Sequence, residues 1–216
     1  DQFMPNAKAF DQMGKIASAL AMTILDAIAA GTLAAVIAFI LAVIASRVSG
    51  VGGPVQMVIR AFATVLRNIP TVAWGFILLF SFKQAEFTGF LALFFKSLGF
   101  LTRAFIETID EADAGSIEAL KATGTTWWQQ IARGVFPDKL NEILSWIFIR
   151  FENNFVGAVT VGAIAGSGGI GYYLYIVANY MFNWHEMGLI IYLCLAVSVT
   201  LEIIATQLRK RFIVHR

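Results

Sequence analysis

An apolar run near the start of the chain constrains the fold most, because between Ile16 and Ser46 the only charged residue is Asp26. A helix crosses the hydrocarbon core of a bilayer with about 20 consecutive apolar residues, so this run predicts a transmembrane helix over about residues 20–45. The rest of the chain has the same character, with 58% of 216 residues hydrophobic and 14% charged. Soluble domains have about 45–50% apolar and about 25% charged residues. We therefore expect an all-α, polytopic transmembrane helical bundle in one domain.

The remaining composition excludes other classes of protein. The 18 glycines and 4 prolines show no collagen-like period, and the one cysteine, Cys194, cannot form an internal disulfide. A formal net charge of +2 is too small for a nucleic-acid-binding surface. His185 and His215 are far apart, with no cysteine or carboxylate at ligand spacing, so no metal site is predicted. No nucleophile stands beside a base, so we expect no catalysis within this chain.

The apolar runs predict about five spans. They cover about residues 20–45, 57–82, 87–109, 142–164 and 187–208. The second run begins as an amphipathic helix, since Arg60 and Arg67 are seven residues apart on one face, and Pro70 then starts or kinks a helix. Lys96 and Arg103 interrupt the third run, and we expect each to face the bundle interior or to extend toward the membrane surface.

The distribution of lysine and arginine predicts the orientation, because basic loops remain in the cytoplasm. Five spans place most basic residues on one side: Arg47, Arg60, Lys121, Arg133, Lys139, Arg209, Lys210, Arg211 and Arg216. Lys8, Lys15 and Lys83 fall on the other side. We expect a cytoplasmic C-terminus and an external N-terminus. Because no signal sequence explains an external N-terminus, we also expect that an N-terminal span is missing or trimmed.

A charged segment over about residues 110–138 is too polar to cross the membrane. Its Ser116–Ala119 stretch and its Gly124 break predict a short helix, a turn and a second helix that ends before Pro137. The residues alone favour a solvated connection and a functional cytoplasmic loop equally.

Within this segment lies a pattern that resembles the EAA signature of permease subunits in bacterial ABC importers. The matching residues are Glu118, Ala119, Leu120, Gly124 and Pro137. The resemblance implies a type I ABC importer permease fold, with a coupling helix that docks in a cleft of the cytoplasmic ATPase. It implies ATPase contact for Glu118, Ala119, Gly124, Phe136 and Pro137. Two positions depart from the signature: Gly134 replaces the usual Ile, and Phe136 replaces the usual Leu.

Further stretches resemble the permeases of phosphonate importers, over about residues 20–212. They are Arg67, Ile69, Pro70 and Trp74, then Gly134–Pro137, Arg150–Asn154 and Gly166–Gly171. Phosphite and other phosphorus oxyanion importers share this permease type, and methionine or osmoprotectant permeases share parts of the pattern. Many relatives carry a second arginine where Val156 stands here.

A polar patch in the fourth predicted span is the main candidate for the transport path. It contains Arg150, Glu152, Asn153 and Asn154. A charge at membrane depth costs at least a few kcal/mol, so Arg150 and Glu152 each need a partner on another helix or subunit. They point about 200° apart around a helix and cannot pair with each other. Two interpretations stay open, a path in which Arg150 attracts an anion and a lock between helices.

Two glycine-containing segments predict close packing. Gly166, Gly168, Gly169 and Gly171 belong to a run that follows a span and has no P-loop lysine, so we reject nucleotide binding. We expect a flexible, close-packed break before a partly re-entrant segment, 172–184, that faces the binding protein or the outer gate; a glycine turn with an aromatic belt is the alternative. The first span carries a small-residue face that suits helix packing: Gly31, Ala34, Ala35, Ala38 and Ala42.

Together the residues and the resemblance predict the membrane-spanning permease of an ATP-driven importer, for phosphonates or related phosphorus oxyanions. The implied partners are ABC ATPase subunits, an extracytoplasmic binding protein and a second permease copy in a homodimer. ATP and Mg would bind the ATPase, and this chain would hold no cofactor. The implied location is the bacterial cytoplasmic membrane. The alternatives are a permease for another small solute such as an amino acid or osmoprotectant, an ion-coupled secondary transporter using Arg150, Glu152 and Glu202, and a membrane enzyme.

Overall fold

The computed structural model describes residues 3–49, 53–82, 86–112 and 114–213. Lys83, His215 and Arg216, which entered the predictions above, lie outside these ranges. The described residues contain helices and no strand, which confirms the all-α prediction. The α-helices are α1 (Ala7–Phe10), α2 (Met13–Ala45), α3 (Gly53–Asn68), α4 (Thr71–Phe82), α5 (Glu86–Asp110), α6 (Ala114–Ala122), α7 (Trp127–Gln130), α8 (Phe136–Ala165), α9 (Gly169–Ile176) and α10 (Trp184–Ile213).

The small-residue face of α2 packs into the core, as predicted. Its five small residues are all buried, and α2 makes its main contact with α5. A Cβ atom on Gly31 would lie 2.7 Å from the Phe151 ring of α8, so only glycine allows this approach. The adjoining apolar cluster includes Leu101 and Phe105 of α5. Short side chains therefore bring α2 close to two other long helices.

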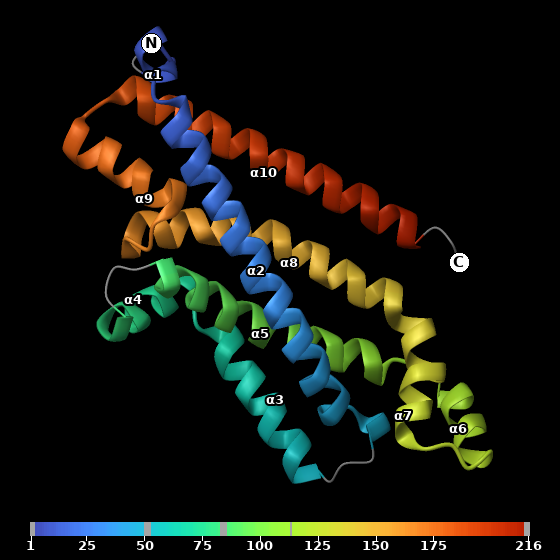
Figure 1. Cartoon of the computed structure of the whole chain (residues 1–216). Coiled ribbons are helices and arrows are strands. Elements are labelled where there is room, and N and C mark those ends of the chain that lie inside the picture. Colours follow the sequence, from blue (N-terminus) through green and yellow to red (C-terminus); the bar gives the residue numbers. More distant parts are fainter. Residues whose placement is uncertain (1–2, 50–52, 83–85, 113, 214–216) are drawn as a thin grey trace.

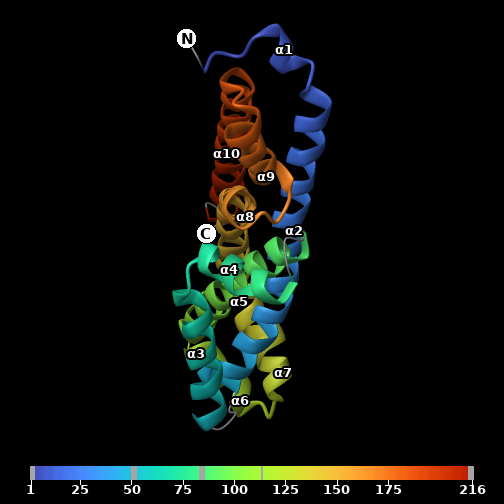
Figure 2. The ribbon, with the colours of Figure 1, turned by 90° about the vertical axis from the view of Figure 1, so that its left-hand side faces the viewer.

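The long helices cross one another in a bundle. Figure 1 shows α2 crossing α5 and α8, while α10 runs along α8. The ends of α2 and α5, the start of α8, and helices α6 and α7 lie toward one side of the molecule; α4, α9 and the N-terminus lie toward the other (Figures 1 and 2). This arrangement separates Lys121 and Lys139 from Lys8 and Lys15, as the predicted orientation requires.

The second predicted span, 57–82, is not one helix. Helices α3 and α4 meet at an angle of 94° across a short break that contains Pro70. Proline lacks an N–H group and its ring clashes with the preceding turn, so a sharp bend at this position has a local cause. The carbonyl groups freed at the bend need other partners. One of them, the Leu66 carbonyl, accepts a hydrogen bond from Nε1 of Trp74 at 3.3 Å.

The expected helix end before Pro137 is wrong. Helix α7, a π-helical turn over Ile131–Val135 and helix α8 form one continuous helical stretch from Trp127 to Ala165. Pro137 lies in the first turn of α8. The wide π-turn that precedes it accommodates a residue that has no backbone N–H to donate. The part of the polar segment from Trp127 onward is therefore continuous with the fourth predicted span.

Four helical stretches are long and apolar enough to cross a membrane. They are Met13–Ala45, Glu86–Asp110, Trp127–Ala165 and Trp184–Lys210, and the bent pair α3 and α4 is a fifth if it crosses as one span. Many large apolar side chains of these helices face outward, including Val36 and Ile40 at 57% and 55% exposure. Outward apolar faces suit contact with lipid or with another membrane subunit.

Candidate functional site: a coupling surface and a polar centre

Helix α6 presents an open face at one end of the molecule (Figure 1). Glu118 and Ala119 are both exposed on it. The helix is followed by Gly124, whose φ of 75° lies in the left-handed region that glycine tolerates best. The Leu120 carbonyl, freed at this helix end, accepts hydrogen bonds from the hydroxyls of Thr123 at 2.7 Å and Thr125 at 2.5 Å. The end of α6 is thus well ordered by its own residues, while its outer face remains available.

The inner face of α6 is anchored to the bundle. Ile117 is 6% exposed and belongs to the same apolar cluster as Ile131 and Val135 of the π-turn. A Cβ atom on Gly134 would lie 2.9 Å from Cδ1 of Leu120. The glycine that departs from the EAA signature therefore provides space for Leu120, and this contact seats α6 against the π-turn.

Phe136 and Pro137 occupy a different place from Glu118, Ala119 and Gly124. The Phe136 ring is 40% exposed and packs edge-on against Phe39 of α2, with ring centroids 6.1 Å apart. The five residues implied to contact the ATPase thus form two groups, one on α6 and its end, the other at the start of α8.

Arg150 and Asn154 belong to a polar chain in the centre of the bundle. Arg150 is 7% exposed, and its Nε donates to Oγ of Ser97 on α5 at 3.0 Å. Oγ of Ser97 donates to Oδ1 of Asn154 at 2.8 Å, and Nδ2 of Asn154 donates to the Ala27 carbonyl on α2 at 3.2 Å. The Arg150 guanidinium also lies over the Phe100 ring, 5.4 Å from its centroid. This chain links α8, α5 and α2.

Glu152 and Asn153 point away from that chain. Asn153 is exposed and bonds only its own helix, through the Ile149 carbonyl at 2.8 Å. Glu152 is half-buried and has no hydrogen bond or ion pair within the described part of the chain. Val156, one turn further along, is 51% exposed. The four residues of the predicted patch therefore divide between an inner, bonded pair and an outer, open pair.

Lys96 has a definite role that the sequence analysis did not identify. Its ammonium group donates to the carbonyls of Arg67 at 2.5 Å and Ile69 at 3.1 Å, both at the bend between α3 and α4. A Cβ atom on Gly99, one turn later in α5, would lie 2.6 Å from the Arg67 backbone nitrogen. Lys96 thus satisfies carbonyls that the bend leaves without a helical partner. The sequence did contain a signal for this role, because a lysine lies in one apolar run and a proline, which frees carbonyls, lies in the neighbouring run.

The glycine loop is closely packed. Gly166, Gly168 and Gly169 have φ values of 68°, 89° and 67°. The backbone N–H of Ile170 donates to Oγ1 of Thr23 on α2 at 2.8 Å. A Cβ atom on Gly171 would lie 1.9 Å from the Val159 carbonyl oxygen, so α8 and α9 touch backbone to backbone. The close packing that we expected is present, and it joins α9 to both α8 and α2.

The segment 172–184 is tied to the start of α10 by a buried carboxylate. Glu186 is 2% exposed and accepts hydrogen bonds from the Tyr173 hydroxyl at 2.5 Å and from Nδ2 of Asn183 at 3.0 Å. Desolvation, and next the hydrogen bond with Glu186, raise the pKa of Tyr173 well above its usual value. The Tyr173 hydroxyl is thus the donor in its hydrogen bond with Glu186.

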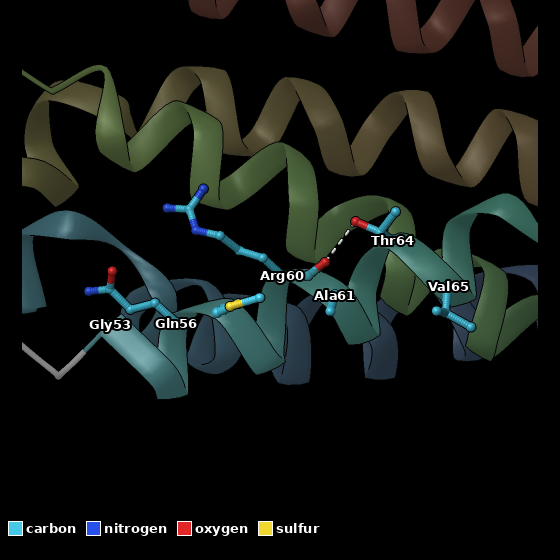
Figure 3. A pocket seen from close by; sticks show the side chains of 7 residues that line it. Gly53, Gln56, Arg60, Ala61, Thr64 and Val65 are labelled. Carbon is cyan, nitrogen blue, oxygen red and sulfur yellow. Dashed lines mark hydrogen bonds between the residues drawn. The ribbon is translucent and has the colours of Figure 1, made fainter.

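Asp110 organises the corner where α2 ends, a role that the sequence analysis also missed. Its Oδ2 lies 2.6 Å from Nη2 of Arg60, and its Oδ1 accepts from the Arg47 backbone N–H at 2.8 Å. Arg60 extends from α3 toward α5 (Figure 3). Its Nη2 also donates to the Ala45 carbonyl at 3.1 Å. The adjoining open cavity, about 600 Å³, is lined by one face of α3: Gly53, Gln56, Met57, Arg60, Ala61, Thr64 and Val65 (Figure 3). One carboxylate therefore joins α2, α3 and α5.

The chain belongs to the family of binding-protein-dependent transport system inner membrane components, whose family model matches residues 34–214. Its fold is that of type I ABC importer permeases. A chain of the MetNI methionine ABC transporter, in an inward-facing form, superposes with a TM-score of 0.81 and 17% identity, covering 94% of this chain and 98% of that one. The predicted fold and family are confirmed, and the chain is a multi-pass membrane permease.

The more similar relatives transport phosphorus oxyanions according to their names. The chain is 28% identical over 190 residues to the phosphite transport system permease protein PtxC of Stutzerimonas stutzeri, covering 88% of this chain and 68% of that one. It is 28% identical over 200 residues to the phosphate-import permease protein PhnE of Mycolicibacterium smegmatis, covering 93% of this chain and 37% of that protein. A cryptic phosphonate transport system permease protein of Escherichia coli, PhnE2, is 32% identical over 124 residues, 57% of this chain and 99% of its own.

Proposed function

We propose that this chain is the permease through which an ABC importer moves a phosphorus oxyanion, such as a phosphonate, phosphite or phosphate, across the bacterial cytoplasmic membrane. The observation that carries the proposal is the similarity to the phosphite permease over 88% of this chain. The chain also has the two features that such a permease needs, an exposed surface on α6 for an ATPase and cationic residues within its predicted spans. An ion-coupled secondary transporter is the weaker alternative, because the whole matched region belongs to a binding-protein-dependent family.

The energy for transport would enter at α6. Its open face, with Glu118 and Ala119, suits docking in a cleft of an ATPase subunit, and the inner contact of Leu120 with Gly134 connects α6 to the π-turn. From that turn α8 runs without a break to Ala165. A displacement of α6 during ATP binding is therefore passed to α8, which carries Arg150, as a movement of one rigid element.

The polar patch suits two roles. The bonded pair, Arg150 and Asn154, holds α8 to α5 and α2, which favours a lock between helices. The open pair, Glu152 and Asn153, faces away from these helices and suits the interface with a second copy of the chain. At the opposite end, the α8–α9 loop and the segment 172–184 would face the extracytoplasmic binding protein.

Reconstitution tests the proposal. The permease, co-expressed with its ATPase and binding protein, is placed in liposomes, and uptake of methylphosphonate, phosphite and phosphate is measured with and without internal ATP. We expect uptake of one or more of these anions only with ATP, and none when Glu118→Lys replaces the native residue while the permease still inserts. Uptake driven by an ion gradient without the ATPase would contradict the proposal.

A further inference from the structure

Three cationic side chains from three helices lie around the middle of α5, beside the bend between α3 and α4. Lys96 lies near the middle of α5, Arg150 near the middle of α8, and Arg67 one residue before the end of α3. The Lys96 ammonium bonds the Arg67 carbonyl at 2.5 Å and interacts electrostatically with the guanidinium groups of Arg67 and Arg150. Arg150 reaches the same turn of α5, because its Nε bonds Ser97. The three side chains thus form one group, the cation cluster.

The cation cluster has no carboxylate partner within the described ranges. The ion pairs there involve Arg47, Arg60, Arg103 and Lys139. The side chain of Arg67 is exposed, and neither it nor the two Nη groups of Arg150 has a hydrogen bond in the described part of the molecule. Arg150 is nevertheless 93% buried, since its exposed fraction is 7%. The Nη groups of Arg150 are not among the fully buried polar atoms, so the exposed part of this residue includes donors that an incoming anion could reach.

The local backbone adds to the positive field. Lys96 binds carbonyls at the end of α3. The negative end of that helix dipole offsets only about half an elementary charge, whereas the cluster carries three positive charges. Helix α4 begins at Thr71, directly after the bend, and its first turn directs free N–H groups and the positive end of its dipole toward this region. Helices broken at mid-membrane with such an end toward an anionic group are a known design of ligand sites in transporters.

We propose that Lys96, Arg67 and Arg150 form a transit site that binds the phosphorus oxyanion midway across the membrane. This inference rests on the proposed function. A tetrahedral oxyanion with one to two negative charges would neutralise much of the positive charge of the cluster. It would also accept hydrogen bonds from the free guanidinium donors. Lys96, held by the bend, supplies a fixed charge. The exposed Arg67 is the member that an anion arriving along the path meets first. The occupancy is brief, because transport requires the anion to leave again.

Charge-selective chemical modification tests the site. Arg67→Cys is introduced in a Cys194→Ala background, and the importer is reconstituted. The new thiol is treated with 2-aminoethyl methanethiosulfonate, which adds a positive charge, or with 2-sulfonatoethyl methanethiosulfonate, which adds a negative one. The rate of modification is also measured on the purified permease without ATP, with and without methylphosphonate. Arg103→Cys is the matched control, because Arg103 is an α5 cation already paired with Glu107 at 2.5 Å.

We expect Arg67→Cys to lower maximal uptake about tenfold with little change in the apparent KM, which the binding protein sets. The positive reagent restores uptake and the negative reagent does not. Methylphosphonate slows the modification at Arg67→Cys severalfold and leaves that at Arg103→Cys unchanged. Arg67→Lys, which keeps the charge, retains uptake.

Other outcomes overturn the site. Equal effects of the two reagents, together with no protection by methylphosphonate, show that the cluster does not meet the anion. Failure of both Arg67→Cys and Arg67→Lys to assemble makes Arg67 a structural residue. If Arg67→Glu and Glu152→Arg each abolish uptake but restore it together, the cluster is neutralised by a second copy. If the wild-type permease takes up none of the three anions, the proposed function is refuted instead. The protection assay, which needs no ATP, still tests whether methylphosphonate binds at the cluster.

Discussion

The contact between α8 and α9 makes Gly171→Ala the most sharply defined perturbation. The new Cβ atom would lie 1.9 Å from the Val159 carbonyl oxygen, whereas ordinary contacts begin at 3.4 Å. The clash is with backbone, so no side-chain rotation relieves it, and the two helices must separate by up to 1.5 Å, the difference between these distances. Overpacking costs about 1–3 kcal/mol. Separation also threatens the hydrogen bond from Ile170 to Thr23, worth about 1 kcal/mol.

We therefore expect Gly171→Ala to lower the free energy of unfolding by about 2–4 kcal/mol. The measurement is SDS titration of the purified permease in mixed micelles, followed by circular dichroism, with uptake assayed in parallel. Gly14→Ala is the matched control, since no atom lies within 4 Å of its new Cβ. Alanine in that exposed helical position should leave stability unchanged or raise it by up to about 1 kcal/mol.

One result would refute this reasoning. If Gly171→Ala unfolds at the same SDS concentration as the wild-type chain and retains full uptake, the backbone contact between α8 and α9 does not exist in the membrane. A variant that is stable but inactive would instead mean that the hairpin has opened locally, with the loss confined to the outer end.

Three further predictions concern the end of the molecule that carries α6. Glu118→Lys should abolish uptake and ATPase stimulation without changing insertion or thermal stability, because the side chain is exposed; normal stimulation would contradict the coupling role. Gly134→Ile should cost about 1–3 kcal/mol by overpacking against Leu120 and should weaken ATPase stimulation, whereas Gly134→Ala needs only a shift of one methyl group. Adding Leu120→Ala to Gly134→Ile should restore much of the stimulation, which a double-mutant cycle measures. Asp110→Asn should lower the free energy of unfolding by about 1.5–3 kcal/mol through loss of the charged bond to Arg60, and an unchanged SDS midpoint would rule out that corner as a lock.

Much of the fold could be predicted from local sequence. The apolar runs gave the long helices, because length and hydropathy are properties of a segment and do not depend on its neighbours. The small-residue face of α2 was recognised as core for the same reason, from Gly31 and its alanines alone. The break at Pro70 was visible as a possibility, but its 94° angle was not, since the angle depends on how α5 supports the freed carbonyls.

The candidate site was predictable in part. The EAA pattern located α6 and its glycine end, because these depend on residues close in sequence. The division of the polar patch into a bonded pair and an open pair could not be read from spacing alone, since it depends on which neighbouring helices cover α8. The pairing of Asp110 with Arg60 joins residues 50 positions apart, and no local pattern announces it.

By itself, therefore, the sequence determined that the chain is helical and spans a membrane, that it has a permease signature, and which residues carry charge. Only the tertiary structure decided which charges are compensated. Arg60 and Arg103 have carboxylate partners, whereas Lys96, Arg67 and Arg150 have none among the described residues, although they lie within electrostatic reach of one another. The physical reason is that electrostatic energy depends on distance through space in a medium of low dielectric constant, and helices far apart along the chain set those distances only when they pack.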